Sequence, residues 1–248
     1  KLTSTASDPH YSSLQFIYSA GAWDHESKRI AIATVIAGRP ALAIFDAASG
    51  DRQRDIKVPD VDEIFNPTWS PDGRAICFTG MSRGVTDLFI VDTSSGAMRQ
   101  LTHDAFADLQ PAWSPDGQRI AFATDRFSSQ LDTLTIGDYR IGFIDPATGR
   151  IEQANAFTNG KNINPQWSPD SRTLYFIADR DGIPNLYRMP VGRGEVGQVT
   201  NVFTGISGIT NTSPAISVSE TGVAAFSIYD QGKYDIYTRQ GEPPSPGQ

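Results

Sequence analysis

A seven-residue phrase recurs along the chain and constrains its fold more than any other feature. It reads PTWSPDG at 67–73, PAWSPDG at 111–117 and PQWSPDS at 165–171. A degenerate copy surrounds Trp23, and in a fifth copy, SPAISVSETG, Ile216 takes the place of the tryptophan. A repeat of roughly 45 to 55 residues is typical of a solenoid, an array or a propeller.

The content of each repeat decides between these architectures. Short apolar strands with alternating polarity follow each copy of the phrase, at 29–35, 74–80, 119–125, 173–179 and 222–230. A second strand comes after each of them, and an outer strand is visible at 96–102, 150–158 and 194–200. With the strand that carries the tryptophan, each repeat holds four strands and shows no helical periodicity. This pattern predicts an all-β fold, a β-propeller of four-stranded antiparallel blades.

Five blades are visible, and they divide residues 1–240 at 13–56, 57–102, 103–158, 159–200 and 201–240. Residues 241–248 are rich in Pro and Gly and are typical of a linker or tail. The fifth blade lacks a fourth strand, whereas Lys-Leu-Thr at 1–3 matches the outer-strand endings QLT at 100–102 and QVT at 198–200. Either the N-terminal residues complete the last blade, or further blades outside this sequence make a ring of six or seven. We slightly favour the second.

The phrase itself is explained by turn chemistry. Pro presets φ at the first corner of a turn, Ser and Asp hydrogen-bond to the local backbone, and Gly accepts the positive φ that closes a hairpin. Asp72, Asp116 and Asp170 are therefore expected to be turn residues. The tryptophans of the phrase are expected to pack between neighbouring blades.

Charge and composition exclude several classes of function. The net charge is −7, and no run of Lys or Arg exceeds two, so the sequence lacks the basic patch of a nucleic-acid-binding or anionic-membrane-binding protein. No apolar run approaches the ~18 residues that a membrane-spanning helix needs. The single cysteine, Cys77, lies in the apolar stretch AICFTG and is expected to be a buried, inert thiol.

The motif P-x-W-S-P-D-G-x-x-I/L-x-F, with DRDGIPNLY at 179–187 and LT at the blade end, resembles the TolB-type WD40-like (PD40) propeller repeat. The resemblance covers almost the whole chain. The stretches at 13–23, 134–145 and 199–210 also resemble the propeller portion of long bacterial secreted or envelope proteins. A relative of this kind would place the segment outside the cytoplasm, in the periplasm, at the outer membrane or in the medium.

The resemblance implies a non-catalytic scaffold that binds a protein or peptide across one face or in the central channel. The alternative is a propeller that docks or gates substrate for a peptidase-like domain elsewhere in the parent chain. No catalytic residue is assigned. Ser82 lies in a G-x-S-x-G match, GMSRG, but it joins two strands and lacks the strand-to-helix turn that a nucleophile elbow requires.

One polar position per blade is a candidate for ligand binding. It lies three residues before the Pro of P-x-W, and we assign Tyr18, Asp108, Asn162 and Asn211 to it, with Ile64 at the same place in the second blade. Because inner strands line the axis of a propeller, these residues are expected to form a ring at the channel mouth. The alternative is that they satisfy local backbone groups in loops.

The third blade carries an insertion, QLDTLTIGDY at 130–139, between its second and third strands. Insertions in repeat proteins map to loops on one face, often the binding face. Leu131, Leu134, Ile136 and Tyr139 are therefore candidates for an apolar contact with a partner. A loop that folds back over a neighbouring blade or plugs the ring is the equal alternative.

No cofactor is expected. Asp179, Asp181 and Asn185 are weak candidates for calcium, but they fall short of a full calcium loop, and an Asp-Gly hairpin turn explains the stretch more simply. His10, His25 and His103 are solitary, so the sequence holds no zinc motif.

Overall fold

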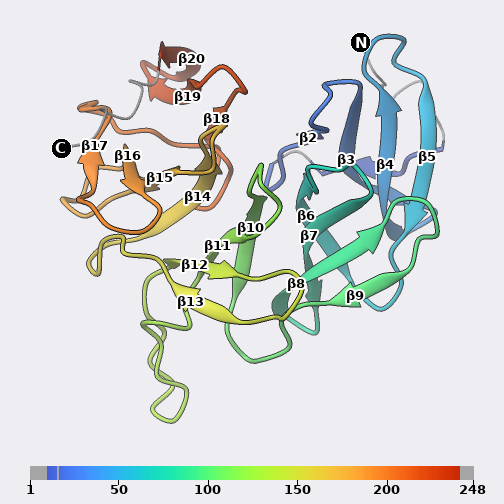
Figure 1. The fold of residues 1–248 in the computed structure, drawn as a ribbon, viewed down its shortest axis with the longest axis horizontal. Helices are drawn as coiled ribbons and strands as arrows, with labels where there is room; N and C mark the ends of the chain where they lie inside the picture. The colour runs from blue at the N-terminus through green and yellow to red at the C-terminus, as the bar shows by residue number, and fades with distance from the viewer. Residues whose placement is uncertain (1–9, 16, 241–248) are drawn as a thin grey trace.

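The computed structural model describes residues 10–15 and 17–240, which form twenty β-strands arranged in five antiparallel sheets. No α-helix occurs among these residues, and hence no helix of membrane-spanning length and hydrophobicity. Figure 1 shows the sheets following one another as blades around a common axis, in chain order from blue to red. The predicted all-β propeller of antiparallel blades is confirmed.

Blade 1 differs from the others in its innermost strand, which is split in two. Its strands are β1 (Ser13–Leu14), β2 (Ala22–Trp23), β3 (Arg29–Ile36), β4 (Arg39–Asp46) and β5 (Arg52–Lys57). Both β1 and β2 pair with β3, β1 opposite Thr34 and Val35 and β2 opposite Ile30 and Ala31. The two pieces together hold the place of one inner strand.

Blades 2, 3 and 4 have the predicted four strands in simple order from the axis outward. Blade 2 comprises β6 (Glu63–Trp69), β7 (Ala75–Ser82), β8 (Val85–Asp92) and β9 (Met98–Gln100). Blade 3 comprises β10 (Asp108–Trp113), β11 (Ile120–Thr124), β12 (Arg140–Ile144) and β13 (Ile151–Gln153). Blade 4 comprises β14 (Asn162–Trp167), β15 (Thr173–Ala178), β16 (Asn185–Pro190) and β17 (Gly197–Gln198).

Blade 5 has three strands in the described residues, β18 (Ile216–Val218), β19 (Val223–Asp230) and β20 (Lys233–Gln240). The described residues hold no fourth strand for this blade. The expectation that Ile216 takes the tryptophan position is wrong by two residues. Ser219 forms the turn that Ser70 forms in blade 2, its hydroxyl accepting from the Val223 amide, so Val218 stands where Trp69 stands. Residues 1–3, one of the two alternatives for completing blade 5, and residues 241–248, the predicted linker or tail, lie outside the described residues.

The repeated phrase forms the turn between the first and second strand of each blade. In all three full copies the serine hydroxyl donates to the aspartate two residues later at 2.6 Å, and that aspartate accepts an amide beyond it. Gly73 and Gly117 have φ of 68° and 75°, and Ser171 adopts 59° at the same position. The turn reading of Asp72, Asp116 and Asp170 is confirmed.

Hydrophobic clusters lie between successive blades, so each blade is stabilised mainly by its neighbours. Trp69 is 6% exposed between blades 1 and 2 and donates its indole N–H to the Ala22 carbonyl at 3.0 Å. Trp167 is 7% exposed between blades 3 and 4 and donates to the Ala112 carbonyl at 2.8 Å. Cys77 is fully buried, and burial raises the pKa of its thiol. The predicted packing of these tryptophans between blades is confirmed.

Candidate functional site

A β-bulge near the start of the inner strand positions the polar residues of blades 2, 3 and 4. Asn66, Gln110 and Asn164 have positive φ of 48°, 53° and 53°, and the register of each inner strand shifts at this point. Each bulge residue precedes a proline in the sequence. Bulges of this kind re-aim a side chain away from the alternation of the strand.

The re-aimed side chains join the inner strands of different blades. We call Ser19, Asn66, Gln110, Asn164 and Ser213 the polar belt. Blades 1 and 2 are joined because the Ser19 hydroxyl accepts from the Asn66 amide at 2.8 Å. Blades 3 and 4 are joined because the Gln110 side-chain oxygen accepts from the Asn164 amide at 2.7 Å.

The same belt joins blade 5 to the rest. The Asn164 side-chain oxygen accepts two amides of blade 5, from Ala215 at 2.7 Å and Ile216 at 2.9 Å. Across the axis, the Gln110 side chain donates to the Thr212 carbonyl at 2.7 Å. Ser213 reaches blade 1 through a 2.6 Å bond from its hydroxyl to the Ile17 carbonyl. The belt therefore ties the five blades together near the axis.

Beside the belt, the inner strands of all five blades line an open central cavity of about 780 Å³. All four tryptophans contribute to its wall, with Asn66, Gln110 and Asn164 of the belt. A volume of this size is typical of a ligand site and is large enough for part of an extended peptide. At its rim, His25 of blade 1 and Glu220 of blade 5 form an exposed ion pair at 2.9 Å.

Trp23 is the wall residue that differs most from its counterparts. Trp23 is 56% exposed, because among the described residues no neighbouring blade packs over it as blades 1 and 3 pack over Trp69 and Trp167. An exposed indole in a concave, partly polar wall offers a large apolar face and one N–H donor to a ligand. Trp23 is therefore the most accessible aromatic group of the cavity wall.

The four predicted channel-mouth residues are not among those that line this cavity. Asp108 and Asn162 are fully buried between blades, Tyr18 is 49% exposed and packs edge-on against Phe65, and Asn211 is exposed with its carbonyl bonded to Lys161. The prediction was wrong because it ignored the bulge. The bulge turns toward the axis the residue that lies two positions after the predicted one, so Asn66, Gln110 and Asn164 face the cavity instead.

Asp108 has a structural partner instead of a ligand. Its carboxylate accepts from the Arg126 guanidinium at 2.6 Å, and Arg126 also binds Asp104 at 2.9 Å. Burial raises the pKa of Asp108, although the hydrogen bonds from Arg126 and Thr124 act against the rise. Asn162 is likewise bound locally, its side-chain nitrogen donating to the Phe157 carbonyl at 3.0 Å. Both residues lie in inner strands and not in loops, and only Asn162 bonds a nearby backbone carbonyl, as the alternative expected.

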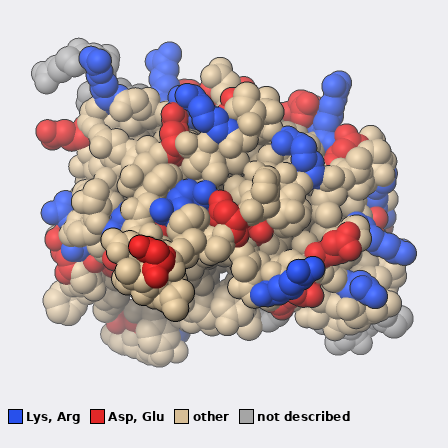
Figure 2. Space-filling model, turned by 90° about the horizontal axis from the view of Figure 1, so that it is seen from below, with Lys and Arg blue, Asp and Glu red and all other residues tan. Residues whose placement is uncertain are grey.

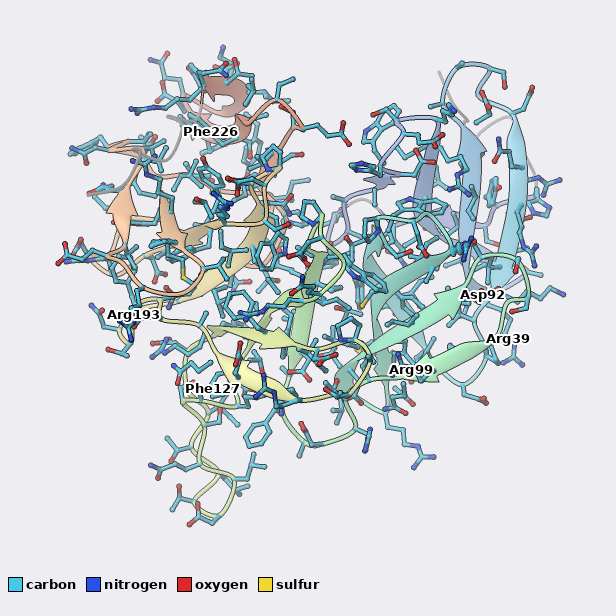
Figure 3. All side chains as sticks on the ribbon, viewed as in Figure 1. Arg39, Asp92, Arg99, Phe127, Arg193 and Phe226 are labelled. Carbon is cyan, nitrogen blue, oxygen red and sulfur yellow. The ribbon has the colours of Figure 1, made fainter. Side chains whose placement is uncertain are left out.

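The insertion of blade 3 forms a hairpin that projects from the body of the molecule (Figure 1). A short bridge between Gln130 and Thr135 closes its tip. Leu134 and Ile136 are 83% and 69% exposed, and Leu131 is 38% exposed. Tyr139 instead packs on the cluster between blades 4 and 5. Phe127, labelled in Figure 3, marks the base of the hairpin. The hairpin does not plug the ring.

Each calcium candidate has a partner within the protein. Asp179 accepts from the Lys161 amide at 2.5 Å, Asp181 pairs with Arg180 at 3.1 Å, and Asn185 bonds to Thr200 and Val202. Within 10–15 and 17–240, no three His, Cys, Asp or Glu side chains gather as a metal site would require. Ser82 ends β7, and a two-residue turn, Arg83-Gly84, leads directly into β8. Its G-x-S-x-G match is thus a hairpin, as predicted.

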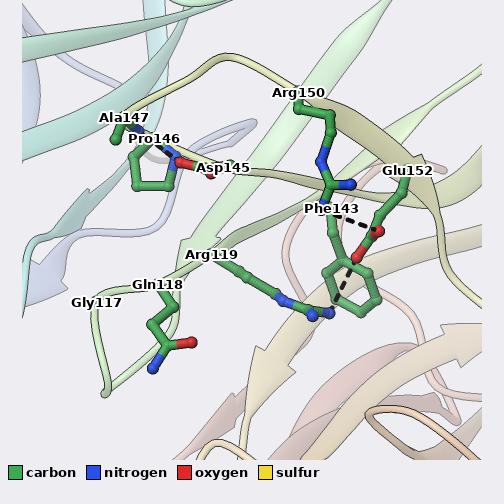
Figure 4. A pocket seen from close by; sticks show the side chains of 9 residues that line it. All are labelled: Gly117, Gln118, Arg119, Phe143, Asp145, Pro146, Ala147, Arg150 and Glu152. Carbon is green, nitrogen blue, oxygen red and sulfur yellow. Dashed lines mark hydrogen bonds and ion pairs between the residues drawn. The ribbon is translucent and has the colours of Figure 1, made fainter.

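A second hollow, of about 380 Å³, lies on blade 3 between the phrase turn and the outer strand. Figure 4 shows that Arg119 and Arg150 both point to Glu152, at 3.1 and 3.8 Å, and Arg119 also lies over Phe143. Three of its four charged groups are thus paired with one another, and the fourth, Asp145, accepts the Ala147 and Thr148 amides. Figure 2 shows Lys and Arg interspersed with Asp and Glu on the face seen from below, without a large area of one sign.

Sequence reasoning missed Asn66, Gln110 and Asn164 because it counted from the strand pattern without the bulge. The signal was present in the sequence. An amide residue directly precedes the proline of the phrase in blades 2, 3 and 4, and Asn is among the residues that tolerate positive φ best. Such a residue directly before a conformationally restricted proline indicates a position with positive φ, as at a bulge.

The comparisons with known proteins agree with this fold. The TolB beta propeller domain model (PD40) matches residues 11–133. Dipeptidyl-peptidase 5 of Porphyromonas gingivalis is 31% identical over 146 residues, which are 54% of this chain and 20% of that protein. The chain therefore spans only a fifth of that relative.

Two solved structures share the architecture. TolB from Acinetobacter baumannii superposes with a TM-score of 0.70 at 19% identity. The superposition covers 92% of this chain and 52% of the TolB chain. Puromycin hydrolase superposes with a TM-score of 0.66 at 18% identity, and the superposition covers 94% of this chain and 37% of the hydrolase chain. At these identities the likeness shows the fold alone. The family model thus assigns TolB-type repeats to residues 11–133, and the structural likeness shows the same propeller fold across the chain.

Proposed function

We propose that this propeller is a non-catalytic binding domain that takes an extended segment of a partner protein into its central cavity. The observation that carries the proposal is the wall of that cavity. It combines the exposed face of Trp23 with the amide side chains of the polar belt, inside a volume of about 780 Å³. An aromatic platform together with a few convergent polar groups is typical of sites that bind peptides.

The charges of the wall favour binding over chemistry. Two acidic side chains lie among the cavity residues, and both have partners, Asp24 with Arg29 at 2.7 Å and Glu220 with His25 at 2.9 Å. A general acid or base needs a proton-transfer position facing the substrate. Asp24 is 6% exposed, and hydrogen bonds from Arg29 outweigh the opposing effect of burial and lower its pKa. It therefore holds the blade junction.

The likeness to TolB and to a dipeptidyl-peptidase also supports a place in the bacterial cell envelope, the periplasm or the medium. A protein or peptide partner outside the cytoplasm is consistent with the net charge of −7, which favours a basic or neutral ligand.

Selection from a phage-displayed library of random linear peptides tests the proposal. We expect peptides that bind the wild-type chain and lose at least about tenfold in affinity with Trp23→Ala, because truncating a central aromatic residue typically costs about 2 kcal/mol or more. Phe203→Ala is the matched control, since Phe203 is 91% exposed and is not a cavity residue. Equal affinity for the wild type and Trp23→Ala, or no selected peptide, would contradict the proposal.

The match to dipeptidyl-peptidase 5 favours a second candidate, in which the propeller docks or gates substrate for a catalytic domain of the parent protein. The two proposals differ in the fate of the bound peptide. If the propeller docks substrate, the intact parent protein should cleave the peptides selected on this chain, and mass spectrometry would detect the cleavage products. Peptides that stay intact with the parent protein would exclude the second candidate and leave the first.

A further inference from the structure

The connection between the second and third strands is longer in blade 3 than in any other blade. Two residues join these strands in blades 1, 2 and 5, at 37–38, 83–84 and 231–232, and residues 179–184 join them in blade 4. In blade 3, residues 125–139 lie between β11 and β12 and form the projecting hairpin (Figure 1). The extra length is therefore not needed to connect the two strands.

The hairpin is anchored at its base to the inner strands of two blades. Arg126, on the outgoing arm, binds Asp108 of β10 at 2.6 Å. On the returning arm, the Tyr139 carbonyl accepts from the Asn162 amide of β14 at 2.9 Å. Both arms are thus held by the rigid part of the propeller.

Hydrogen bonds also join the two arms above the base. The Ser129 hydroxyl donates to the Asp125 carboxylate at 2.7 Å and accepts from the Gly137 amide at 2.9 Å. Nearer the tip, Gln130 and Thr135 exchange two backbone hydrogen bonds of 2.8 and 3.0 Å. Because the hairpin has its shape before any partner arrives, a partner that binds it loses little affinity to ordering of the loop.

The tip of this ordered hairpin presents aliphatic side chains to solvent. Leu134 is 83% exposed, Ile136 69% and Leu131 38%, and none of them belongs to a core cluster of the described residues. Leu134 also has a φ of 53°, an uncommon and unfavourable backbone conformation for leucine. Local strain that no packing repays, together with three neighbouring exposed aliphatic groups, is typical of a contact surface.

The charges of the hairpin indicate the kind of surface that it contacts. Between positions 127 and 139 it carries two acids, Asp132 and Asp138, and no Lys or Arg. Asp132 is exposed, and Asp138 is 58% exposed and 3.9 Å from the Arg140 guanidinium. Opposite charges around an apolar contact give it specificity and speed association. The complementary surface is therefore an apolar pocket bordered by Lys or Arg.

A lipid surface is the other apolar ligand that such a tip could meet. Loops and helices that bind membrane surfaces carry Lys or Arg and aromatic residues. The tip at 130–136 has neither, and Asp132 lies between Leu131 and Leu134, so insertion of the leucines would bring a carboxylate toward the hydrocarbon. A pocket on a protein fits the hairpin better.

We propose that the blade 3 hairpin inserts Leu134 and Ile136 into an apolar pocket, bordered by Lys or Arg, on a folded partner protein. Leu131 packs at the margin of this contact, and Asp132 faces the basic border. No residue of 127–139 lines the central cavity, so this is a second binding surface and does not rest on the proposed function.

Site-specific crosslinking in cells that produce the parent protein is the first part of the test. A photoreactive amino acid replaces Leu134, and in the control it replaces Phe203, which is 91% exposed outside the hairpin. We expect a separate protein to crosslink through position 134 and not through position 203. Mass spectrometry identifies this protein, which is then purified for a binding measurement.

The dissociation constant for the purified partner is the second part. Leu134→Ser and Ile136→Ser should each raise it at least about tenfold, because truncating a central apolar contact costs this much. Both side chains are exposed, so thermal unfolding should not change. Asp132→Lys should raise the dissociation constant by about threefold, as expected for an exposed ion pair. Asp51→Lys changes the net charge equally, in the turn between β4 and β5, and should have no effect.

Four results would overturn the proposal. A crosslink only to another segment of the parent chain, or only to a second copy, would assign the tip to that contact. Flotation of the wild-type chain with phosphatidylcholine vesicles, abolished by Leu134→Ser, would assign the tip to lipid. The absence of a crosslink at position 134 would show that the tip has no protein ligand. Equal affinity of the wild type and Leu134→Ser for the purified partner would show that the tip does not carry the binding.

Discussion

At the scale of single residues, the phrase turns show how one position can serve two blades. Gly73 has a positive φ, and its carbonyl accepts from Arg29 of blade 1 at 3.1 Å. Arg29 also binds Asp24 and lies 4.3 Å over the Trp69 ring. The turn of blade 2 thus holds the guanidinium that connects it to blade 1.

Two glycine-to-alanine variants separate the effect of the positive φ of Gly73 from the effect of its closeness to Arg29. Gly73 and Gly149 have similar φ, 68° and 73°, but a Cβ at Gly73 would lie 2.5 Å from the Arg29 guanidinium, whereas none of the atoms around Gly149 lies within 4 Å. Gly149→Ala should lower the free energy of unfolding by about 1 kcal/mol through φ alone. Gly73→Ala should cost about 1 kcal/mol more, because it displaces Arg29. Urea denaturation measures both, and equal losses would contradict this account of the junction.

Asp24 predicts a pH dependence of stability. Its folded-state pKa lies below the usual value, because hydrogen bonds from Arg29 and Lys28 outweigh the effect of burial. The stabilisation is therefore present above pH ~4 and is lost as the pH falls through the folded-state pKa. Asp24→Asn should cost about 1–2 kcal/mol at pH 7, and its deficit relative to the wild type should shrink in acid. A deficit that stays constant down to pH ~2 would contradict the assignment.

At the scale of elements, the inner strand combines two devices, a bulge that bonds across blades and a tryptophan that packs between them. The tryptophan was predictable from the sequence because it recurs with the turn. The bulge was missed, although an amide residue precedes each proline, because counting along the strand pattern places Asp108 and Asn162 at the axis, whereas the structure buries both. Blade 1 differs more from the other blades, since β1 and β2 together take the place of one inner strand. The degenerate motif around Trp23 did not predict this split.

Substitutions in two inner strands test the tryptophan contribution. Trp167→Phe removes the 2.8 Å bond to the Ala112 carbonyl and part of a buried ring, so we expect a loss of about 1–3 kcal/mol in the free energy of unfolding. Trp23→Phe changes a 56% exposed side chain and should cost about 0.5 kcal/mol or less. Chemical denaturation of both variants measures the difference. Similar losses would mean that Trp23 is packed in solution as the other tryptophans are.

At the scale of the whole molecule, the sequence predicted the architecture well but not the residues that line the central cavity. Four-stranded blades, turn positions and the incomplete blade 5 follow from a local pattern that each repeat restates. The cavity depends on how five inner strands meet, which no single repeat encodes, and Trp23 is 56% exposed in its wall. Function is therefore expected where the blades differ from one another: at Trp23 and at the projecting hairpin.

The most direct test of the central claim is a crystal structure of the chain with a peptide selected on it. The account predicts peptide density in the central cavity, against the indole of Trp23 and beside Gln110 and Asn164. Density on the outer surface, for instance over Leu134 and Ile136 of the blade 3 hairpin, with an empty cavity, would contradict it.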